Sequence, residues 1–148
     1  MSKLTEKVIV ITGASEGIGR ALAVTLAPQR PRLVLAARSR DRLQSCADEC
    51  SAIGAECLIV PTDVTDENEC KNLIDETIER FGRIDVLVNN AGGTMWARFD
   101  EVEDLSIYEN LMRLNYLSAV WLTYHALPHL KATKGLIVGI SSLAGITG

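Results

Sequence analysis

Short, nearly continuous apolar runs alternate along this chain with segments of helical periodicity. The apolar runs lie at residues 8–11, 33–37, 58–60, 84–88 and 136–140. Runs of this length are typical of strands that are covered on both faces, as in a parallel sheet. The alternation therefore predicts an α/β fold, a doubly wound parallel sheet of about five strands with helices on both faces.

The segments between these runs have apolar residues three or four positions apart. Ile18, Leu22 and Leu26 repeat every four residues, and residues 70–81 trace one face of a second helix. Asp66 stands at the N-cap position of that second helix. Glycines that can end helices follow at positions 54 and 82.

Length and charge limit the classes of protein to which this chain can belong. A chain of 148 residues is long enough for one domain, and its formal charge of −4 argues against a nucleic-acid partner. The sequence has no apolar stretch of the roughly 18 residues that a membrane span needs. The N-terminus has no apolar signal core, so a cytoplasmic location is expected.

The cysteines and histidines do not form a metal-binding pattern. Cys46 and Cys50 are four residues apart, but no second pair or nearby histidine completes a zinc set. His125 and His129 are also four apart, without the glutamate of a zinc-protease helix. We therefore predict no metal site, and the four cysteines are expected as packed thiols.

Three glycines stand between the first predicted strand and the first predicted helix. The first amide N–H groups of a helix are unpaired, and the helix dipole adds about half a positive charge there. Glycine at Gly13, Gly17 and Gly19 would let a pyrophosphate approach those amides. A tight contact between strand and helix, which also needs small residues, is the alternative. We predict a nucleotide site at this turn.

The spacing of these glycines resembles a known family signature. Residues 12–19, TGASEGIG, match the TGxxxGIG motif of the short-chain dehydrogenase/reductase family. Three more motifs follow in order, DVT at 63–65, NNAG at 89–92 and ISSLAG at 140–145. Each follows a predicted strand, at the edge where open α/β sheets bind ligands. The resemblance runs from Lys7 to Gly148 and implies a single NAD(P)-binding, Rossmann-type domain over residues 1–148.

The end of the second predicted strand bears on the choice of cofactor. Ala37 stands where an acid that binds the ribose of NAD would be expected, and Arg38 follows it. A guanidinium can hold phosphate oxygens in a two-pronged contact, so we predict NADP(H) in preference to NAD(H). A solvated loop charge is the alternative interpretation of Arg38.

The resemblance also implies roles for residues around the cofactor. By this resemblance, Ser15 and Ile18 contact the phosphates, Asp63 and Val64 flank the adenine, and Asn89, Ala91 and Gly92 line the cofactor groove. The side-chain amides of Asn89 and Asn90 also have a structural interpretation, because an amide can bridge neighbouring loops.

The chemistry that the resemblance implies is hydride transfer between the cofactor and a small-molecule alcohol or carbonyl. The glycines of SSLAGITG match Ser142 to the family's catalytic serine, and LNYLSAV places Asn115 at the catalytic asparagine. Asn115 lies among leucines on a predicted helix and therefore needs a partner for its amide. The family's tyrosine is expected beyond Gly148, and the chain contains no Tyr-x-x-x-Lys sequence.

The last two predicted elements are incompletely covered. A helix from about Ser106 to about Lys131 would expose Trp121, Leu122 and Leu130, and nothing follows to cover the strand at 136–140. We therefore expect the N-terminal part of a longer, truncated dehydrogenase, which by resemblance would be a homo-oligomer at full length. A non-catalytic dinucleotide-binding or interaction module is the alternative.

Overall fold

The structure, a computed structural model, describes residues 3–142 and contains a parallel sheet. Its strands are β1 (Val8–Thr12), β2 (Arg32–Ala37), β3 (Glu56–Pro61), β4 (Val86–Asn89) and β5 (Leu136–Gly139). They lie in the order β3-β2-β1-β4-β5, and every neighbouring pair is parallel. The chain thus moves outward from β1 to β3 and returns to the other side of β1 with β4. The predicted doubly wound parallel sheet is confirmed.

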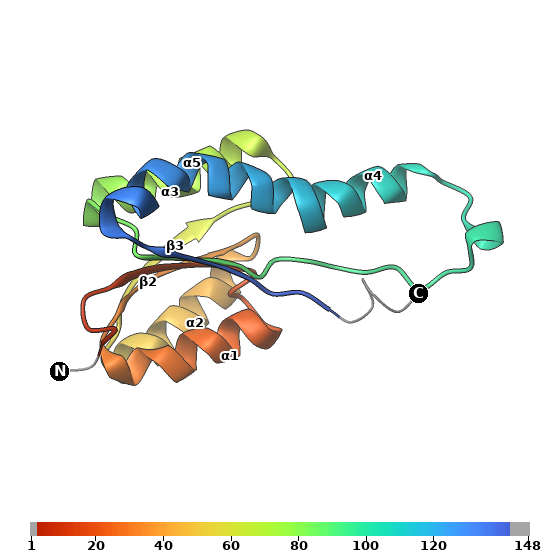
Figure 1. Cartoon of the computed structure of the whole chain (residues 1–148). Helices are drawn as coiled ribbons and strands as arrows, with labels where there is room; N and C mark the ends of the chain where they lie inside the picture. Colours follow the sequence, from red (N-terminus) through yellow and green to blue (C-terminus); the bar gives the residue numbers. More distant parts are fainter. Residues whose placement is uncertain (1–2, 143–148) are drawn as a thin grey trace.

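Helices cover both faces of this sheet (Figure 1). Helices α1 (Gly17–Leu26) and α2 (Arg40–Ala52) lie on one face, while α3 (Glu67–Phe81) and α5 (Ser118–Thr133) lie on the other. Two short 3-10 turns, Ala27–Gln29 (η1) and Phe99–Glu101 (η2), complete the connections.

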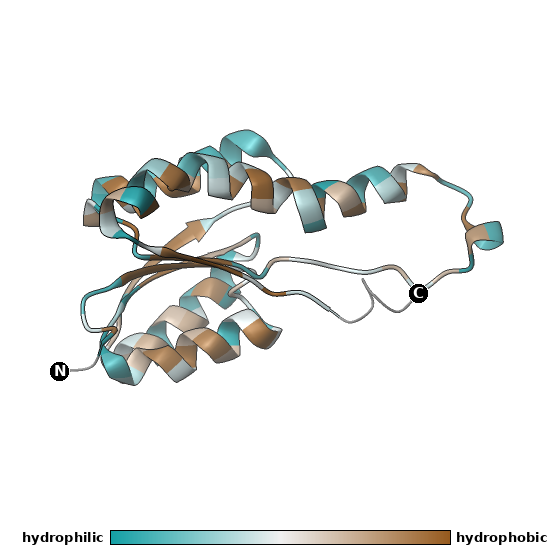
Figure 2. Cartoon of the chain, in the orientation of Figure 1, coloured by the Kyte–Doolittle hydropathy of each residue, from teal (hydrophilic) through white to brown (hydrophobic). Residues whose placement is uncertain are grey.

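Alternate residues of β1 enter different halves of the core. Val8 and Val10 pack in the cluster beneath α3 and α5, whereas Ile9 and Ile11 pack beneath α1 and α2. Figure 2 accordingly shows the sheet as a continuous hydrophobic layer between helices whose colouring is mixed. A strand buried on both faces explains why its sequence reads as an unbroken apolar run.

The predicted helix ends are also observed. The Asp66 side chain accepts hydrogen bonds from the backbone N–H groups of Asn68 and Glu69, which makes it the N-cap of α3. Gly82 caps the end of α3 with φ 70°, in the left-handed region that favours glycine.

The long helix predicted from Ser106 to Lys131 is not one regular helix. It consists of α4 (Ser106–Met112), a π-helical turn at Arg113–Leu117 (η3) and α5. The π turn changes which side chains face the core, because it inserts an extra residue into the helical repeat.

The prediction that Leu122 and Leu130 would be exposed is wrong. They are 1% and 4% exposed and belong to the core beneath α3 and α5, and Trp121 is half-buried against the same cluster. The exposed apolar side chains of this region are instead Met112, Tyr116, Val120, Tyr124 and Leu127.

Strand β5 lies at an edge of the sheet and pairs only with β4 among the described strands. Leu136 and Ile137 are exposed, as expected for an apolar strand that no later element of residues 3–142 covers. No helix within residues 3–142 is both long enough and apolar enough to cross a membrane.

Candidate functional site

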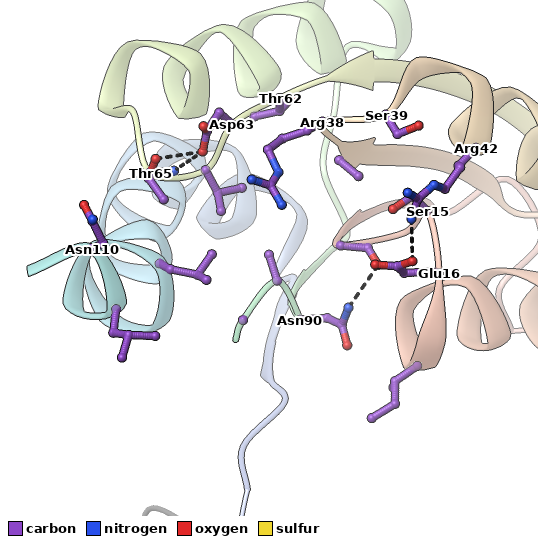
Figure 3. Close-up of a pocket in the computed structure, with 18 of the residues that line it drawn as sticks. Ser15, Glu16, Arg38, Ser39, Arg42, Thr62, Asp63, Thr65, Asn90 and Asn110 are labelled. Atoms are coloured by element: carbon purple, nitrogen blue, oxygen red, sulfur yellow. Dashed lines mark hydrogen bonds and ion pairs between the residues drawn. The ribbon is translucent and has the colours of Figure 1, made fainter. Parts of the chain in front are cut away.

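A groove of about 840 Å³ opens at the carboxyl edge of the sheet (Figure 3). The loops that follow β1, β2, β3 and β4 form most of its wall, and residues from α4 and the π turn close one side. Volumes of about 300–1,000 Å³ are usual for sites that bind small molecules and cofactors. The position also matches the crevice where open α/β sheets bind ligands.

The N-terminus of α1 is open toward this groove. Glu16 occupies the N-cap position, but its side chain makes no capping hydrogen bond, unlike Asp66 at the start of α3. The first N–H groups of α1 therefore have no intrahelical acceptor and no side-chain cap. Ser15 and Ile18, on either side of this helix start, line the groove. This arrangement favours an anion at the start of α1.

Close packing explains two of the three glycines. A Cβ on Gly19 would lie 2.4 Å from the Gly13 carbonyl oxygen, and a Cβ on Gly13 would lie 2.8 Å from the Asn90 Nδ2. At Gly17 a Cβ would meet nothing within 4 Å, and its φ is +55°. Both interpretations of the glycine turn thus have support, because Gly13 and Gly19 allow tight packing while Gly17 leaves open space.

Thr12 and Asn90 join the loops after β1 and β4. The N–H groups of Asn90 and Ala91 each donate to the Thr12 Oγ1 at 3.0 Å, and the Asn90 Nδ2 donates to the Thr12 carbonyl oxygen at 2.8 Å. The bridging interpretation of Asn90 is confirmed. Thr12 was not among the predicted site residues, although a threonine that ends an apolar strand is a usable signal of such a bridge.

Charged side chains stand on the walls of the groove. In Figure 3 the Arg38 side chain extends between Asp63 and the ion pair of Glu16 with Arg42. A hydrogen bond from the Thr65 N–H lowers the pKa of Asp63. Partial burial opposes this, and the Thr65 hydroxyl and the Arg38 charge lower the pKa further. Asp63 is therefore a firmly ionised carboxylate beside the groove.

Asn115 lies at the centre of the π turn, and both ends of its amide are used. Its Oδ1 accepts from the Gly93 N–H at 2.9 Å, and its Nδ2 donates to the Gly93 carbonyl oxygen at 2.9 Å. A Cβ on Gly92 would lie 3.0 Å from the Asn115 Oδ1. Asn115 thus has the amide partner that its sequence context requires, and it fixes the loop that follows β4. π turns are frequent at functional sites.

Not every predicted site residue lies on the groove wall. The groove is lined by the predicted residues Gly13, Ser15, Ile18, Arg38, Asp63, Val64, Ala91 and Gly92. Gly17, Gly19, Asn89, Asn115 and Ser142 are not part of that lining. The wall also includes Ile107, Asn110, Leu111 and Leu114, which were not among the predicted site residues.

Asn89 and Ser142 have different surroundings. The Asn89 Nδ2 donates to the Thr123 Oγ1 at 3.4 Å, while its Oδ1 is buried without a hydrogen-bond partner among residues 3–142. Ser142 is exposed and lies three residues beyond the end of β5. The glycines that match Ser142 to the family motif, Gly145 and Gly148, lie outside the described residues.

Comparison with known proteins points to one family. The model of the short chain dehydrogenase family matches residues 7–148. The 11-beta-hydroxysteroid dehydrogenase-like 2 protein of Arabidopsis thaliana is 40% identical over 144 residues, which are 97% of this chain and 47% of that protein. This chain therefore spans about half the length of that curated relative.

Two solved structures show the same fold with nicotinamide dinucleotides bound. The NADH-dependent reductase A1-R' complexed with NAD matches with a TM-score of 0.89 at 31% identity, over 96% of this chain and 62% of that one. The alcohol dehydrogenase of Thermococcus sibiricus complexed with 5-hydroxy-NADP matches with a TM-score of 0.87 at 33% identity, over 96% and 60%. Related folds thus bind either kind of dinucleotide.

Proposed function

This chain belongs to the short-chain dehydrogenase/reductase family, and from that premise we propose that it is part of an NADP(H)-dependent oxidoreductase that interconverts an alcohol and a carbonyl. The observation that carries the proposal is the groove, which joins the open N-terminus of α1 to the guanidinium of Arg38. An anion-binding helix end and a phosphate-binding side chain in one groove suit a dinucleotide with an additional phosphate.

The residues on the groove wall suit different parts of such a cofactor. We propose that Ser15, Ile18 and the first amides of α1 hold the diphosphate, and that Asp63 and Val64 flank the adenine. Arg38 would hold the 2′-phosphate beside Ser39, which stands at the N-cap of α2 without making a side-chain capping bond.

The bound cofactor would supply or accept the hydride, and the protein residues would orient the substrate and move its proton. Ser142 is proposed to donate a hydrogen bond to the substrate oxygen. Asn115 is proposed to support the site through Gly93, because its side-chain amide hydrogen-bonds both the N–H and the carbonyl oxygen of that residue. Because residues 1–148 contain no Tyr-x-x-x-Lys sequence, we expect this chain to bind the dinucleotide with little turnover.

A comparison of NADPH and NADH binding by calorimetry tests the cofactor preference. We expect the chain to bind NADPH about tenfold tighter than NADH, a difference of about 1.4 kcal/mol. Arg38→Asp should abolish that preference, because the phosphate would then meet a carboxylate. Arg40→Asp is the matched control, since Arg40 begins α2 but does not line the groove. An affinity ratio that Arg38→Asp leaves unchanged would contradict the proposal.

A further inference from the structure

Glu16 and Arg42 form an ion pair at one corner of the groove. Glu16 precedes α1 and Arg42 lies in the first turn of α2, and the Arg42 Nη1 lies 2.5 Å from the Glu16 Oε2. Both side chains line the groove beside Arg38, although they are 71% and 59% exposed. A pair this exposed adds little to folding stability. Its charges nevertheless act on whatever ligand occupies the groove.

The carboxylate of Glu16 stands where it would oppose an anion. It directly precedes the helix end proposed for the diphosphate, and it shares the groove with the guanidinium proposed for the 2′-phosphate. A phosphate monoester carries about −1.5 to −2 charges at neutral pH, so an unpaired carboxylate nearby would weaken its binding. A closely paired guanidinium largely cancels that field beyond a few ångströms.

The two arginines on the wall are differently engaged. The Arg42 guanidinium is held by Glu16, whereas Arg38 makes no hydrogen bond or ion pair with any other described residue. Arg38 is therefore available to an incoming phosphate with its charge uncompensated by a paired carboxylate within residues 3–142, while the charge of Arg42 is already compensated by Glu16. This difference assigns the direct contact to Arg38 and an indirect action to Arg42.

We propose, on the basis of the proposed dinucleotide function, that Arg42 is a specificity-determining positioning residue that acts through Glu16. By neutralising Glu16 and holding its carboxylate in a fixed pair, Arg42 permits a nucleotide with a 2′-phosphate to bind beside Arg38. Both kinds of nucleotide share the diphosphate, but only the one with a 2′-phosphate adds a further charge for Glu16 to repel, so the neutralisation favours that nucleotide.

Two small probes isolate the 2′-phosphate. Calorimetry would give the affinities of adenosine 2′,5′-bisphosphate and of 5′-AMP for each variant, and their ratio reports on that phosphate alone. Arg42→Ala should lower the ratio about fivefold, which corresponds to about 1 kcal/mol. The double variant Glu16→Gln/Arg42→Ala has the same net charge as the unmodified chain and should restore the ratio to within about twofold. Arg42→Lys, which keeps the charge, should also stay close to the unmodified ratio.

Two variants control for other effects. Arg40→Ala removes a positive charge from the same turn of α2 without altering the groove wall. Arg20→Ala breaks another ion pair between α1 and α2, in which the Arg20 Nη2 lies 2.7 Å from the Glu49 Oε2. Neither variant should change the ratio of the two probe affinities. If Arg42→Ala acted by a general loosening of α1 against α2, Arg20→Ala would lower this ratio as well.

The outcomes separate this inference from the proposed function. An unchanged ratio in Arg42→Ala overturns the inference, and so does a double variant as weak as Arg42→Ala, because Arg42 would then contact the phosphate directly. If the chain binds neither of the two probes and neither NADPH nor NADH, the proposed function and the inference are both overturned. If the unmodified chain binds NADH as tightly as NADPH, only the proposed cofactor preference fails, and the ratios of the variants still decide the role of Arg42.

Discussion

At the scale of single residues, the hydroxyl of Thr12 organises the glycine turn. Thr12 is 1% exposed, and its Oγ1 accepts two backbone N–H groups from the loop after β4 while donating to the Val88 carbonyl oxygen at 3.3 Å. One oxygen atom thereby fixes two loops of the groove relative to each other. Its loss would leave two part-buried backbone donors without their acceptor.

Thr12→Val should destabilise the chain by about 2 kcal/mol, because valine keeps the shape of threonine but removes the acceptor. Thr12→Ser keeps the oxygen and should cost about 1 kcal/mol, the value of a buried methyl group. Urea unfolding followed by circular dichroism gives both values. Equal losses in the two variants would show that the hydroxyl is not the stabilising group.

At the scale of elements, Asp85 fastens the start of β1 to the segment before β4. This buried carboxylate accepts from the Lys7 Nζ at 2.9 Å, from the Val8 N–H at 3.0 Å and from the Arg83 Nε at 2.9 Å. Burial by itself raises the pKa of Asp85, but the hydrogen bonds and charges of Arg83, Val8 and Lys7 outweigh it and lower the pKa below the ordinary 3.8.

Asp85→Asn should reduce the free energy of unfolding by about 2 kcal/mol at neutral pH. Because the pKa of Asp85 is depressed in the folded chain, its contribution is complete above the ordinary value of 3.8 and disappears as the pH falls through the folded pKa. The two proteins should therefore converge in stability below pH 3.8, as measured by urea unfolding across pH.

The matched control for this pH dependence is Asp75→Asn, which removes an exposed carboxylate paired with Lys71 on α3. Exposed pairs of this kind contribute about 0–1 kcal/mol, so the control should track the unmodified chain closely at every pH. A gap between Asp85→Asn and the unmodified chain that persists undiminished at low pH would argue against the ionised form as the stabilising species.

At the scale of the whole molecule, burial and strand pairing are most complete at the centre of the sheet. Strands β1, β2 and β4 have hydrogen-bonded neighbours on both sides, and β1 is buried along its whole length. In contrast, β5 is an exposed edge, and the segment from Trp96 to Phe99 presents large apolar side chains to solvent. The α4–α5 region also has exposed apolar side chains, and the homo-oligomer implied by family resemblance stays a prediction.

Amide hydrogen exchange should reproduce this gradient. We expect the slowest exchange in β1 and β2 and fast exchange in residues 93–105, because local opening costs least where few buried contacts and backbone hydrogen bonds are lost. Mass spectrometry of pepsin fragments would resolve these segments. Fragments of β5 that are as protected as those of β1 would indicate that another surface covers β5 in solution.

Much of this organisation could be read from the sequence, because it depends on short-range patterns. An apolar run such as residues 8–11 requires a strand covered on both faces, and Asp66 and Gly82 set helix ends through contacts within one turn. The positions of Ser15, Arg38 and Asp63 at one sheet edge followed as well, since the carboxyl ends of parallel strands meet there.

The tertiary structure alone decided which side chains meet across elements. Leu122 and Leu130 lie four-residue steps apart on the face of α5 that packs in one core cluster with α3, and local sequence could not show which face of this helix would be covered. The pairing of Arg42 with Glu16 and the acceptor role of Thr12 join residues from separate elements, so they depend on how the loops and helices pack rather than on any local spacing. Local sequence determined the elements and their order, whereas contacts between distant residues determined the walls and charges of the groove.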